Sequence, residues 1–464
     1  MFLINSLKKY DDTQKSALTV AALTAFLGPF LMSSVNIALP AIEEEFSLNA
    51  VSLGWVVTSY LLSSAVFLLP LGRVADIWGQ KTVFKWGTVA FIFSTALCGL
   101  APNGFMLIVF RVIQGISASM TLTTGMPILV SAFPPRERGK MLGINVASVY
   151  LGLSMGPFIG GILTQQLGWR SIFLICIPLG LIAVVLTFIK LKKFTDIKHQ
   201  ETIDFTGSAL YIVALTAMVY GSINLSRNFG WILLTGGLLL FALFILQSNR
   251  ARHPVFEMKL FTHNRLFAFS NIAALINYSA TSSIVFLLSL HLQKVNGLSP
   301  QMAGMILISQ PLVMTFLSPL AGRMSDRIEP RLLASLGMFL NAVGLFFLST
   351  IGPDTSGIMF VAILILMGTG FSFFSSPNMN TIMSSVDRKY YGLATGTSAT
   401  MRVLGQMTSV SVATMIFAFF FGKGQIKNVP VPVFIRSENL IFLIFGFLCL
   451  AGVYFSYNRG KLRG

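Results

Sequence analysis

Two copies of a Gly-Arg-x-x-Asp pattern, 250 positions apart, place charged side chains where they could make and break ion pairs. The residues of the first copy with its extension, and then of the second copy, are Gly72, Arg73, Asp76, Gly79 and Lys81, and Gly322, Arg323 and Asp326. Each copy directly follows an apolar stretch, and a following helix would present its positive N-terminus to the carboxylate. An Asp there can latch two parts of a chain together in one conformation and release them in another. The alternative is an ordinary loop salt bridge that fixes a turn. In neither interpretation do these residues touch a ligand.

Two arginines fall inside apolar stretches, where a charge must be paired or hydrated. At mid-membrane depth Arg111 or Arg402 would cost about 2.5–3.5 kcal/mol on insertion scales, so each should face other helices. Gln114 and Gly115 lie three and four residues after Arg111 and share its helix face. Arg111 could pass protons or hold an anionic group; the alternative is a packing contact to backbone carbonyls or to Asn36. For Arg402 both interpretations stay open.

Uncharged polar side chains near mid-membrane are further candidates for a binding pathway. They are Asn277, Tyr278, Gln310 and Asn378. Each of them alone is more often an interhelical hydrogen bond than a ligand contact.

The stretch 141–165 carries glycines at every fourth position. Gly152, Gly156 and Gly160 form a stripe without side chains, and Pro157 and Gly161 lie beside it. Small residues allow helix backbones to approach closely, and a proline can bend a helix. We expect a tight, flexible surface between two moving parts of the chain; plain tight packing is the alternative.

The acidic residues are all predicted to lie in termini and loops, Glu43 and Glu438 included. With two embedded arginines and no embedded acid, the interior should be neutral to positive. A proton carrier would then be peripheral, with Asp76 and Glu43 the better candidates and His291 the third.

The composition excludes a water-soluble protein. The 464 residues are 54% hydrophobic and 11% charged, whereas soluble proteins carry about 25% charged residues. The net charge of +17 is spread over short loops rather than gathered in one patch, so we expect no nucleic-acid partner. Cys98, Cys176 and Cys449 fall in apolar runs without metal-ligand spacing. No nucleophile–base set stands out among the residues, so we expect no metal, no cofactor and no enzyme activity.

Fourteen apolar stretches are long enough to cross a bilayer, which takes about 20 residues. They are 17–40, 52–71, 83–101, 104–130, 141–165, 171–190, 205–224, 229–247, 266–291, 302–321, 331–351, 357–380, 391–421 and 439–457. The predicted fold class is therefore an all-α integral membrane protein.

The basic residues orient these helices. If the sides alternate from a cytoplasmic N-terminus, 25 of the 33 Lys and Arg residues fall inside, 6 outside and 2 within helices. This bias follows the positive-inside rule, so both termini are expected in the cytoplasm. The 250-residue offset of the repeat is longer than six helices need and fits six plus two. We predict two six-helix halves, 1–190 and 266–464, with two inserted helices in 191–265.

Several of these motifs resemble those of the major facilitator superfamily, in particular its fourteen-helix drug:proton antiporter branch of multidrug and toxin exporters. The first Gly-Arg-x-x-Asp copy looks like the family's loop 2–3 signature, and residues 111–115 (RVIQG) look like its helix 4 motif. Residues 152–161 (GLSMGPFIGG) are similar to the helix 5 antiporter motif, and 35–40 (VNIALP) to the end of the helix 1 motif. The branch often has an Asp five residues before the helix 1 Asn, where this chain has Leu31.

The resemblance implies a major facilitator fold and secondary active transport, usually export driven by the proton gradient. The expected substrates are small amphipathic molecules and, with Leu31 in place of an acid, neutral, zwitterionic or anionic ones. The other partners would be protons and the lipid bilayer of the cell (inner or cytoplasmic) membrane. We expect a monomer, with a periplasmic adaptor as a candidate partner in a Gram-negative cell. The alternatives are an uptake symporter or facilitator, or a non-transporting receptor on the same fold.

Overall fold

The computed structural model describes residues 10–190, 204–225, 228–251, 254–256, 258–387, 391–422 and 424–462. The N-terminal helices are α2 (Asp12–Phe46), α3 (Ala50–Trp78), α4 (Gln80–Gly99), α5 (Gly104–Ala132), α6 (Pro135–Leu167), α7 (Arg170–Leu174) and α8 (Cys176–Lys190). The next three are α9 (Phe205–Ile223), α10 (Asn228–Arg250) and α11 (Met258–His263). The C-terminal ones are α12 (Arg265–Thr281), α13 (Ile284–Lys294), α14 (Pro300–Leu307), α15 (Ser309–Ser325), α16 (Pro330–Leu348), α17 (Gly357–Ser384), α18 (Tyr391–Phe421), η3 (Ile426–Asn428) and α19 (Val431–Asn458). Fourteen helical spans are long and apolar enough to cross a membrane, which confirms the predicted number and the all-α class.

Several helices run past the apolar stretches that predicted them. α3 begins where Asn49 accepts a hydrogen bond from the Ser52 backbone N–H, and it continues to Trp78, through the first Gly-Arg-x-x-Asp copy. Its apolar stretch was expected to end at residue 71. Hydropathy marks only the part of a helix that lies in hydrocarbon, whereas backbone hydrogen bonding continues into the polar edge. Asp76 therefore lies in a helix and not in a loop.

Three spans are interrupted. α7 and α8 make the sixth span, α12 and α13 the ninth, and α14 and α15 the tenth. Ser282 and Ser283 separate α12 from α13, and the Ser283 N–H donates to Ser409 Oγ of α18 at 3.0 Å. Breaks within a membrane are tolerated where protein groups satisfy the freed backbone. α13 and α14 are therefore short helices that these breaks separate from α12 and α15.

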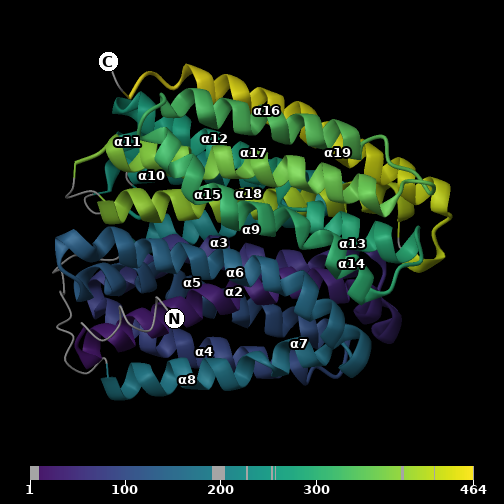
Figure 1. Cartoon of the computed structure of the whole chain (residues 1–464), viewed down its shortest axis with the longest axis horizontal. Coiled ribbons are helices and arrows are strands. Elements are labelled where there is room, and N and C mark those ends of the chain that lie inside the picture. The colour runs from purple at the N-terminus through teal and green to yellow at the C-terminus, as the bar shows by residue number, and fades with distance from the viewer. Residues whose placement is uncertain are drawn as a thin grey trace.

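The helices form two bundles with matching internal packing. Figure 1 shows α2–α8, the N-terminal bundle, in its lower part and α12–α19, the C-terminal bundle, in its upper part. In the first, α2 packs on α6 and α3 on α5; in the second, α12 packs on α18 and α15 on α17. A duplicated chain would give such matched pairs. The boundaries at 190 and 266 stay a prediction, and the loop 191–203 lies outside the described residues.

The two additional spans, α9 and α10, pack against each other at the side of both bundles. α9 contacts α3 of the N-terminal bundle and α18 of the C-terminal bundle. The Tyr211 hydroxyl of α9 donates to the Ala65 carbonyl at 3.3 Å. On α10, Trp231, Ile232 and Leu239 are more than half exposed. The pair therefore adds a lipid-facing surface beside the joint between the bundles.

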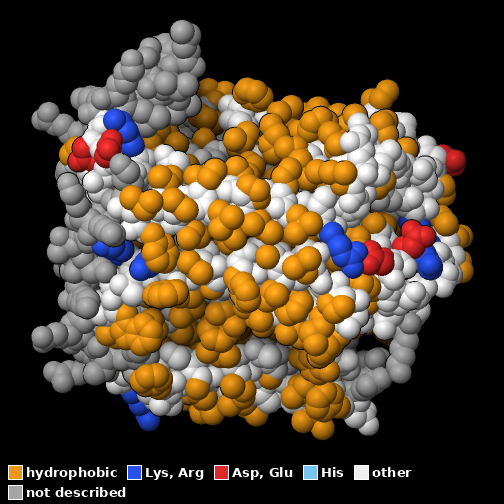
Figure 2. All heavy atoms as spheres, turned by 90° about the horizontal axis from the view of Figure 1, so that it is seen from below, with side chains coloured by type: hydrophobic (Ala, Val, Ile, Leu, Met, Phe, Trp, Pro, Cys, Tyr) orange, Lys and Arg blue, Asp and Glu red, His pale blue; other side chains and the backbone are white. Residues whose placement is uncertain are grey.

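The surface matches a protein that spans a bilayer. Figure 2 shows hydrophobic side chains over most of the face seen from below, with charged side chains toward its two ends. An even number of spans brings the start of α2 and the end of α19 to the same end of the molecule, at the left in Figure 1. We call this the terminal end, and the opposite end, where α13 and α14 lie, the far end.

Candidate functional site

Arg111 on α5 is fully buried in a network of neutral groups. Its Nε donates to the Val56 carbonyl of α3 at 3.0 Å, and its Nη1 donates to Gln114 Oε1 at 2.5 Å. The guanidinium carbon lies 4.3 Å from the centroid of the Tyr60 ring. Gln114 extends the network to α4 because its Nε2 donates to Thr95 Oγ1 at 2.7 Å. These contacts join α3, α4 and α5 within one bundle.

The surroundings of Arg111 favour a packing role. A Cβ on Gly115 would overlap the Tyr60 carbonyl oxygen, so this glycine lets α5 lie against α3. Asn36 on α2 is also buried, and its Oδ1 has no hydrogen-bond partner among the described residues. Arg111 Nη2 also has no hydrogen-bond partner among the described residues. One donor of the guanidinium thus remains available to a ligand or a proton carrier.

A second polar group of residues lies where the two bundles meet. Tyr278 of α12 interacts with the Arg402 guanidinium and the Ser375 hydroxyl of its own bundle and with the Tyr150 phenol of the other. Tyr150 Oη lies 3.4 Å from Ser375 Oγ. We call Tyr150, Tyr278, Ser375 and Arg402 the central cluster. Because α6 supplies one member and α12, α17 and α18 the others, any movement of one bundle against the other rearranges the cluster.

The central cluster has the chemistry of a ligand site. Its four side chains are half-buried, and of the described residues none with a carboxylate takes part in it. Hydroxyls and a guanidinium donate hydrogen bonds to carbonyl, carboxylate or ring-nitrogen groups, and phenol rings can stack on aromatic ligands. One turn along α6, Ser154 Oγ lies 3.4 Å from Thr315 Oγ1 of α15. Tyr278 and Arg402 were predicted; Tyr150 was missed because its helix had been read only for its glycines.

The other predicted polar residues do not join the central cluster. Asn277 Oδ1 accepts from Asn341 Nδ2 at 3.1 Å, which ties α12 to α16. Asn378 Nδ2 donates to the Ser270 carbonyl at 3.1 Å, which ties α17 to α12. Gln310 is buried on α15. For the two asparagines the geometry is that of interhelical hydrogen bonds.

Asn378 has a second partner, a buried cation at the terminal end. Arg459, directly after α19, donates from Nη1 to Asn378 Oδ1 at 2.6 Å. Burial lowers the pKa of Arg459 to about 10, so the group is still charged at neutral pH. Asn378 therefore helps to hold the end of the chain.

The glycine stripe on α6 faces a helix of its own bundle, not the other bundle as expected. The Ser34 hydroxyl of α2 donates to the Gly156 carbonyl at 2.9 Å. A Cβ on Gly152 would lie 2.5 Å from the Phe26 carbonyl oxygen of α2, and Gly160 packs on Ser34 in the same way. The spacing of four predicted one helix face, but it carried no information on which neighbour covers that face.

The backbone of the glycine motif approaches the C-terminal bundle most closely in its last part. Gly304 of α14 lies directly against the Pro157 carbonyl, and a Cβ on Gly161 would lie 2.5 Å from the Pro300 carbonyl oxygen. These close approaches join α6 and α14 toward the far end.

The two Gly-Arg-x-x-Asp copies occupy equivalent places at the terminal end. Gly72 of α3 faces Thr123 of α5, and Gly322 of α15 faces Ser376 of α17. These are the matched helix pairs of the two bundles. The charged side chains of the second copy are exposed, namely Arg323 and Asp326.

The first copy is tied to the segment that follows the additional pair of spans. Arg73 donates from Nε and Nη2 to the Pro254 carbonyl at 3.1 and 2.7 Å. Gly79 between α3 and α4 has φ of 100°, a backbone conformation that is strained for any residue with a side chain. Asp76 and Lys81, on either side of this glycine, are half-buried. Whether Asp76 is a latch stays a prediction.

Polar contacts between the bundles close the far end, and only Glu43 among them was singled out from the sequence. Glu43 lies in the last turn of α2, not in a loop, and accepts from the Lys427 N–H at 2.9 Å. Gln293 of α13 donates to the Ile37 carbonyl of α2 at 3.0 Å. Within the C-terminal bundle, Lys294 Nζ donates to the Lys427 carbonyl at 2.9 Å, which holds α13 to the residue that Glu43 contacts. We call these five residues the far-end closure.

One acid that was assigned to a loop is embedded. Glu438 lies about two turns into α19 and is fully buried, as is His291 on α13. Their side chains form a close pair. The expectation of no embedded acid is therefore wrong. The apolar stretch that predicted this span began at residue 439, whereas the helix begins at Val431.

Comparisons with known proteins agree with this architecture. The family model described as the Major Facilitator Superfamily matches residues 21–270 and 267–463. The chain is 30% identical over 440 residues to the riboflavin transporter RibZ of Clostridioides difficile (strain 630), covering 94% of this chain and 95% of that protein. It is 29% identical over 415 residues to the multidrug resistance protein Stp of Mycobacterium tuberculosis (strain CDC 1551 / Oshkosh), covering 88% and 76%. The crystal structure of a D-xylose-proton symporter has a TM-score of 0.69 at 14% identity, over 97% of this chain and 98% of that one.

Proposed function

Since the chain belongs to the Major Facilitator Superfamily and is a multi-pass membrane transporter, we propose that it exports small amphipathic molecules by alternating access. The proton gradient across the cytoplasmic membrane drives this export, because each substrate leaves in exchange for protons that enter. The terminal end then faces the cytoplasm, because most of the Lys and Arg residues fall on that side. The far end faces outward.

The observation that carries the proposal is the central cluster. Both bundles supply its side chains, and it lies between the two ends of the molecule. Alternating access requires a site of this kind at the joint between the repeats. The far-end closure separates such a site from the outside in the conformation described.

The chemistry of the central cluster favours neutral or anionic substrates. Arg402 supplies a positive charge, and the two tyrosines supply hydroxyls and aromatic faces. A permanent cation would meet a like charge there without a compensating carboxylate. The embedded acid, Glu438, is already paired with His291 in another part of the fold.

The names of the two relatives point to related cargo. One is a multidrug resistance protein, which supports export. The other is a riboflavin transporter, and riboflavin is an uncharged fused-ring molecule with a hydroxylated chain. That name supports such a molecule as a candidate cargo, and its transport in the uptake direction is the second candidate function.

Inverted membrane vesicles with an acidic interior test direction and substrate class together. An exporter accumulates labelled riboflavin or an aromatic organic anion several-fold above vesicles without the protein, and an uncoupler abolishes the difference. Accumulation in right-side-out vesicles alone would support the uptake function instead. Accumulation of quaternary ammonium dyes that depends strictly on the pH gradient would contradict the proposed substrate class.

A further inference from the structure

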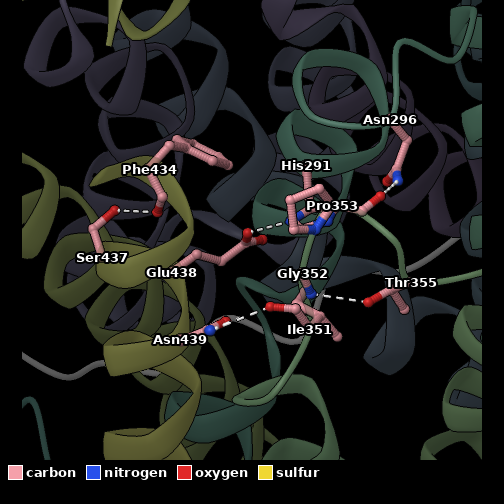
Figure 3. A network of polar contacts seen from close by, with 10 residues as sticks. All are labelled: His291, Asn296, Ile351, Gly352, Pro353, Thr355, Phe434, Ser437, Glu438 and Asn439. Atoms are coloured by element: carbon pink, nitrogen blue, oxygen red, sulfur yellow. Dashed lines mark hydrogen bonds and ion pairs between the residues drawn. The ribbon is translucent and has the colours of Figure 1, made fainter. Parts of the chain in front are cut away.

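A buried pair of titratable side chains lies in the C-terminal bundle, away from the central cluster. His291 of α13 and Glu438 of α19 are both 0% exposed, and His291 Nδ1 lies 2.6 Å from Glu438 Oε2. Figure 3 shows the imidazole and the carboxylate pointing toward each other from these two helices. The Phe360 ring of α17 packs against the imidazole, with 5.4 Å between ring centroids.

Each partner retains one polar atom that nothing satisfies. His291 Nε2 and Glu438 Oε1 have no hydrogen-bond partner among the described residues. Within the same residues, only His291 compensates the charge of the carboxylate. The other charged groups toward this end of the elements around the pair include Glu43, Glu44 and Glu45 on α2, Lys294 on α13, Asp354 before α17, Lys427 on η3 and Arg436 on α19.

Burial determines how many protons the pair must hold. An uncompensated ion in a dry site is costly, so the closed pair has to be neutral overall. It is neutral with one shared proton, either as imidazolium and carboxylate or as imidazole and carboxylic acid. In water at pH 7, the ordinary pKa values of about 6.5 for His and 4.3 for Glu leave the two groups without that proton. When the pair is excluded from water at neutral pH, it therefore takes up one proton.

The pair clamps the segment that closes the far end. α13 is separated from α12 by Ser282 and Ser283 and packs on α2 of the other bundle. His291 holds it to α19, and two residues later Gln293 holds it to Ile37. Lys294 lies three residues after His291 and therefore on the same helix face. Movement of α13 away from α2 would break the Gln293–Ile37 bond, which ties this segment to the other bundle.

A surface hollow lies beside the first turns of the helix that carries Glu438. The hollow, of about 420 Å³, is lined by Pro353, Val431, Pro432, Ile435, Arg436 and Asn439. Asn439, the residue after Glu438, donates from Nδ2 to the Ile351 carbonyl at 3.2 Å, and Asn296 donates to the Pro353 carbonyl at 3.2 Å (Figure 3). These bonds tie both helices of the pair to the loop that borders the hollow.

We propose that His291 and Glu438 form a proton-binding site that controls the far end. Closure takes one proton from far-end water and holds it between His291 Nδ1 and Glu438 Oε2; opening returns it. Because opening returns the proton to the same side, the site regulates closure and does not itself carry the proton across the membrane; the use of this regulation in transport rests on the proposed export function. The coupling between far-end closure and proton binding at this pair does not require substrate.

Spin labels across the far end measure this linkage directly. Leu167 at the end of α6 and Ile358 at the start of α17 are exposed and belong to different bundles. Cysteines at both positions, labelled in nanodiscs, report open and closed distances by double electron–electron resonance. The closed state binds one more proton, so the closed-to-open ratio should rise as pH falls from about 8 to about 6.5, by up to about tenfold per pH unit. Below that range the ratio should level off, because the imidazole is then protonated in both states.

The variant Glu438→Gln should reverse the response. Its amide keeps a hydrogen bond to the imidazole, and the closed pair is then neutral with no added proton. A proton that His291 gains in the open state below about pH 6.5 must leave on closure, so acid should open the far end. In the double variant His291→Gln, Glu438→Gln, the pH dependence that this site gives to the closed-to-open ratio should be lost. Glu43→Gln, at the far-end closure, is the matched control. Its closed-to-open ratio should still rise as pH falls, as in the unsubstituted protein.

Retention of the unsubstituted pH response by Glu438→Gln would overturn the proposal. If that variant does not fold, His291→Gln decides: its closed state still needs a proton on Glu438, so its response should continue below pH 6.5 without levelling off. If the closed-to-open ratio of His291→Gln levels off at the same pH as that of the unsubstituted protein, the proposed site is wrong. These distances are measured without substrate or gradient, so a failure of export in vesicles and a failure of this linkage are separate results.

Discussion

Arg111 and Arg402 both lie within membrane-spanning helices but in different surroundings. Arg111 is fully buried and donates to two neutral acceptors of its own bundle. Arg402 is half-buried beside Tyr278, where both bundles meet. Sequence alone gave both residues the same two interpretations, because a single chain does not reveal which neighbours surround a helix face. The structure separates them, and substitutions at the two positions should have different effects.

Replacing Arg402 should weaken substrate binding without unfolding the protein. We expect Arg402→Gln to raise the apparent Kd for a neutral or anionic substrate by at least about tenfold, which corresponds to about 1.4 kcal/mol. Tyr278→Phe should act in the same direction by about 1 kcal/mol, the worth of one hydrogen bond. Binding to purified protein measures both. Tyr211→Phe, which removes a hydroxyl at the additional spans, is the control and should leave Kd unchanged.

Replacing Arg111 should mainly lower stability. Arg111→Ala leaves the Val56 carbonyl and Gln114 Oε1 buried without this donor, and each unsatisfied acceptor costs about 1–3 kcal/mol. We expect a melting temperature lower by several degrees in a thermal unfolding assay. An unchanged melting temperature together with lost transport would instead support a proton-relay or anion-binding role.

At the scale of elements, α6 connects the two kinds of packing in the molecule. Its glycine stripe holds α2 within the N-terminal bundle, while Pro157 and Gly161 meet α14 of the other bundle. Tyr150 and Ser154 on the same helix reach α17 and α15. A rigid union of α2 and α6 lets α6 transmit movement of its bundle to the central cluster.

Adding a methyl group to the stripe should disturb that union. In Gly152→Ala the new Cβ would lie 2.5 Å from a backbone oxygen of α2, which a rotamer change cannot relieve. Overpacking of this kind costs about 1–3 kcal/mol, so the melting temperature should fall. Gly143→Ala on the same helix meets open space and should be neutral or stabilising by about 0.5–1 kcal/mol. Equal melting temperatures for the two variants would contradict this packing role.

The first Gly-Arg-x-x-Asp copy makes a prediction about the joint at the terminal end. Asp76→Asn keeps the size of the side chain and removes its charge, so we expect transport to be lost while the melting temperature stays the same. Transport in proteoliposomes and thermal unfolding measure the two effects. Unchanged transport would show that the motif only stabilises a turn and has no role as a latch. Asp326→Asn in the exposed second copy should have the smaller effect.

At the scale of the whole molecule, the features that follow from one-dimensional patterns were predictable. Span number follows from runs of apolar residues, and all fourteen spans are present. Tyr278 and Arg402 stood out as polar residues in apolar runs; their interaction is seen only in the structure, and their role in a binding pathway stays a prediction.

The features that depend on which helices become neighbours were not predictable. The partner of the glycine stripe, the role of Tyr150 and the far-end closure all arise from contacts between distant segments. Glu438 was misplaced by a single residue at the edge of an apolar stretch, because polar residues at a helix start look like loop residues. Its pairing with His291, 147 positions away, left no trace in local spacing.

The central claim is that the two bundles exchange substrate for protons, and one measurement tests it most directly. Proteoliposomes loaded with substrate and a pH-sensitive dye are diluted into substrate-free buffer at equal pH. As substrate leaves, an exchanger brings protons in, so the lumen should become acidic, and an uncoupler should remove the signal. A lumen that becomes alkaline would show that substrate and protons move together, and substrate efflux without any pH change would show that protons are not coupled; either result contradicts the account.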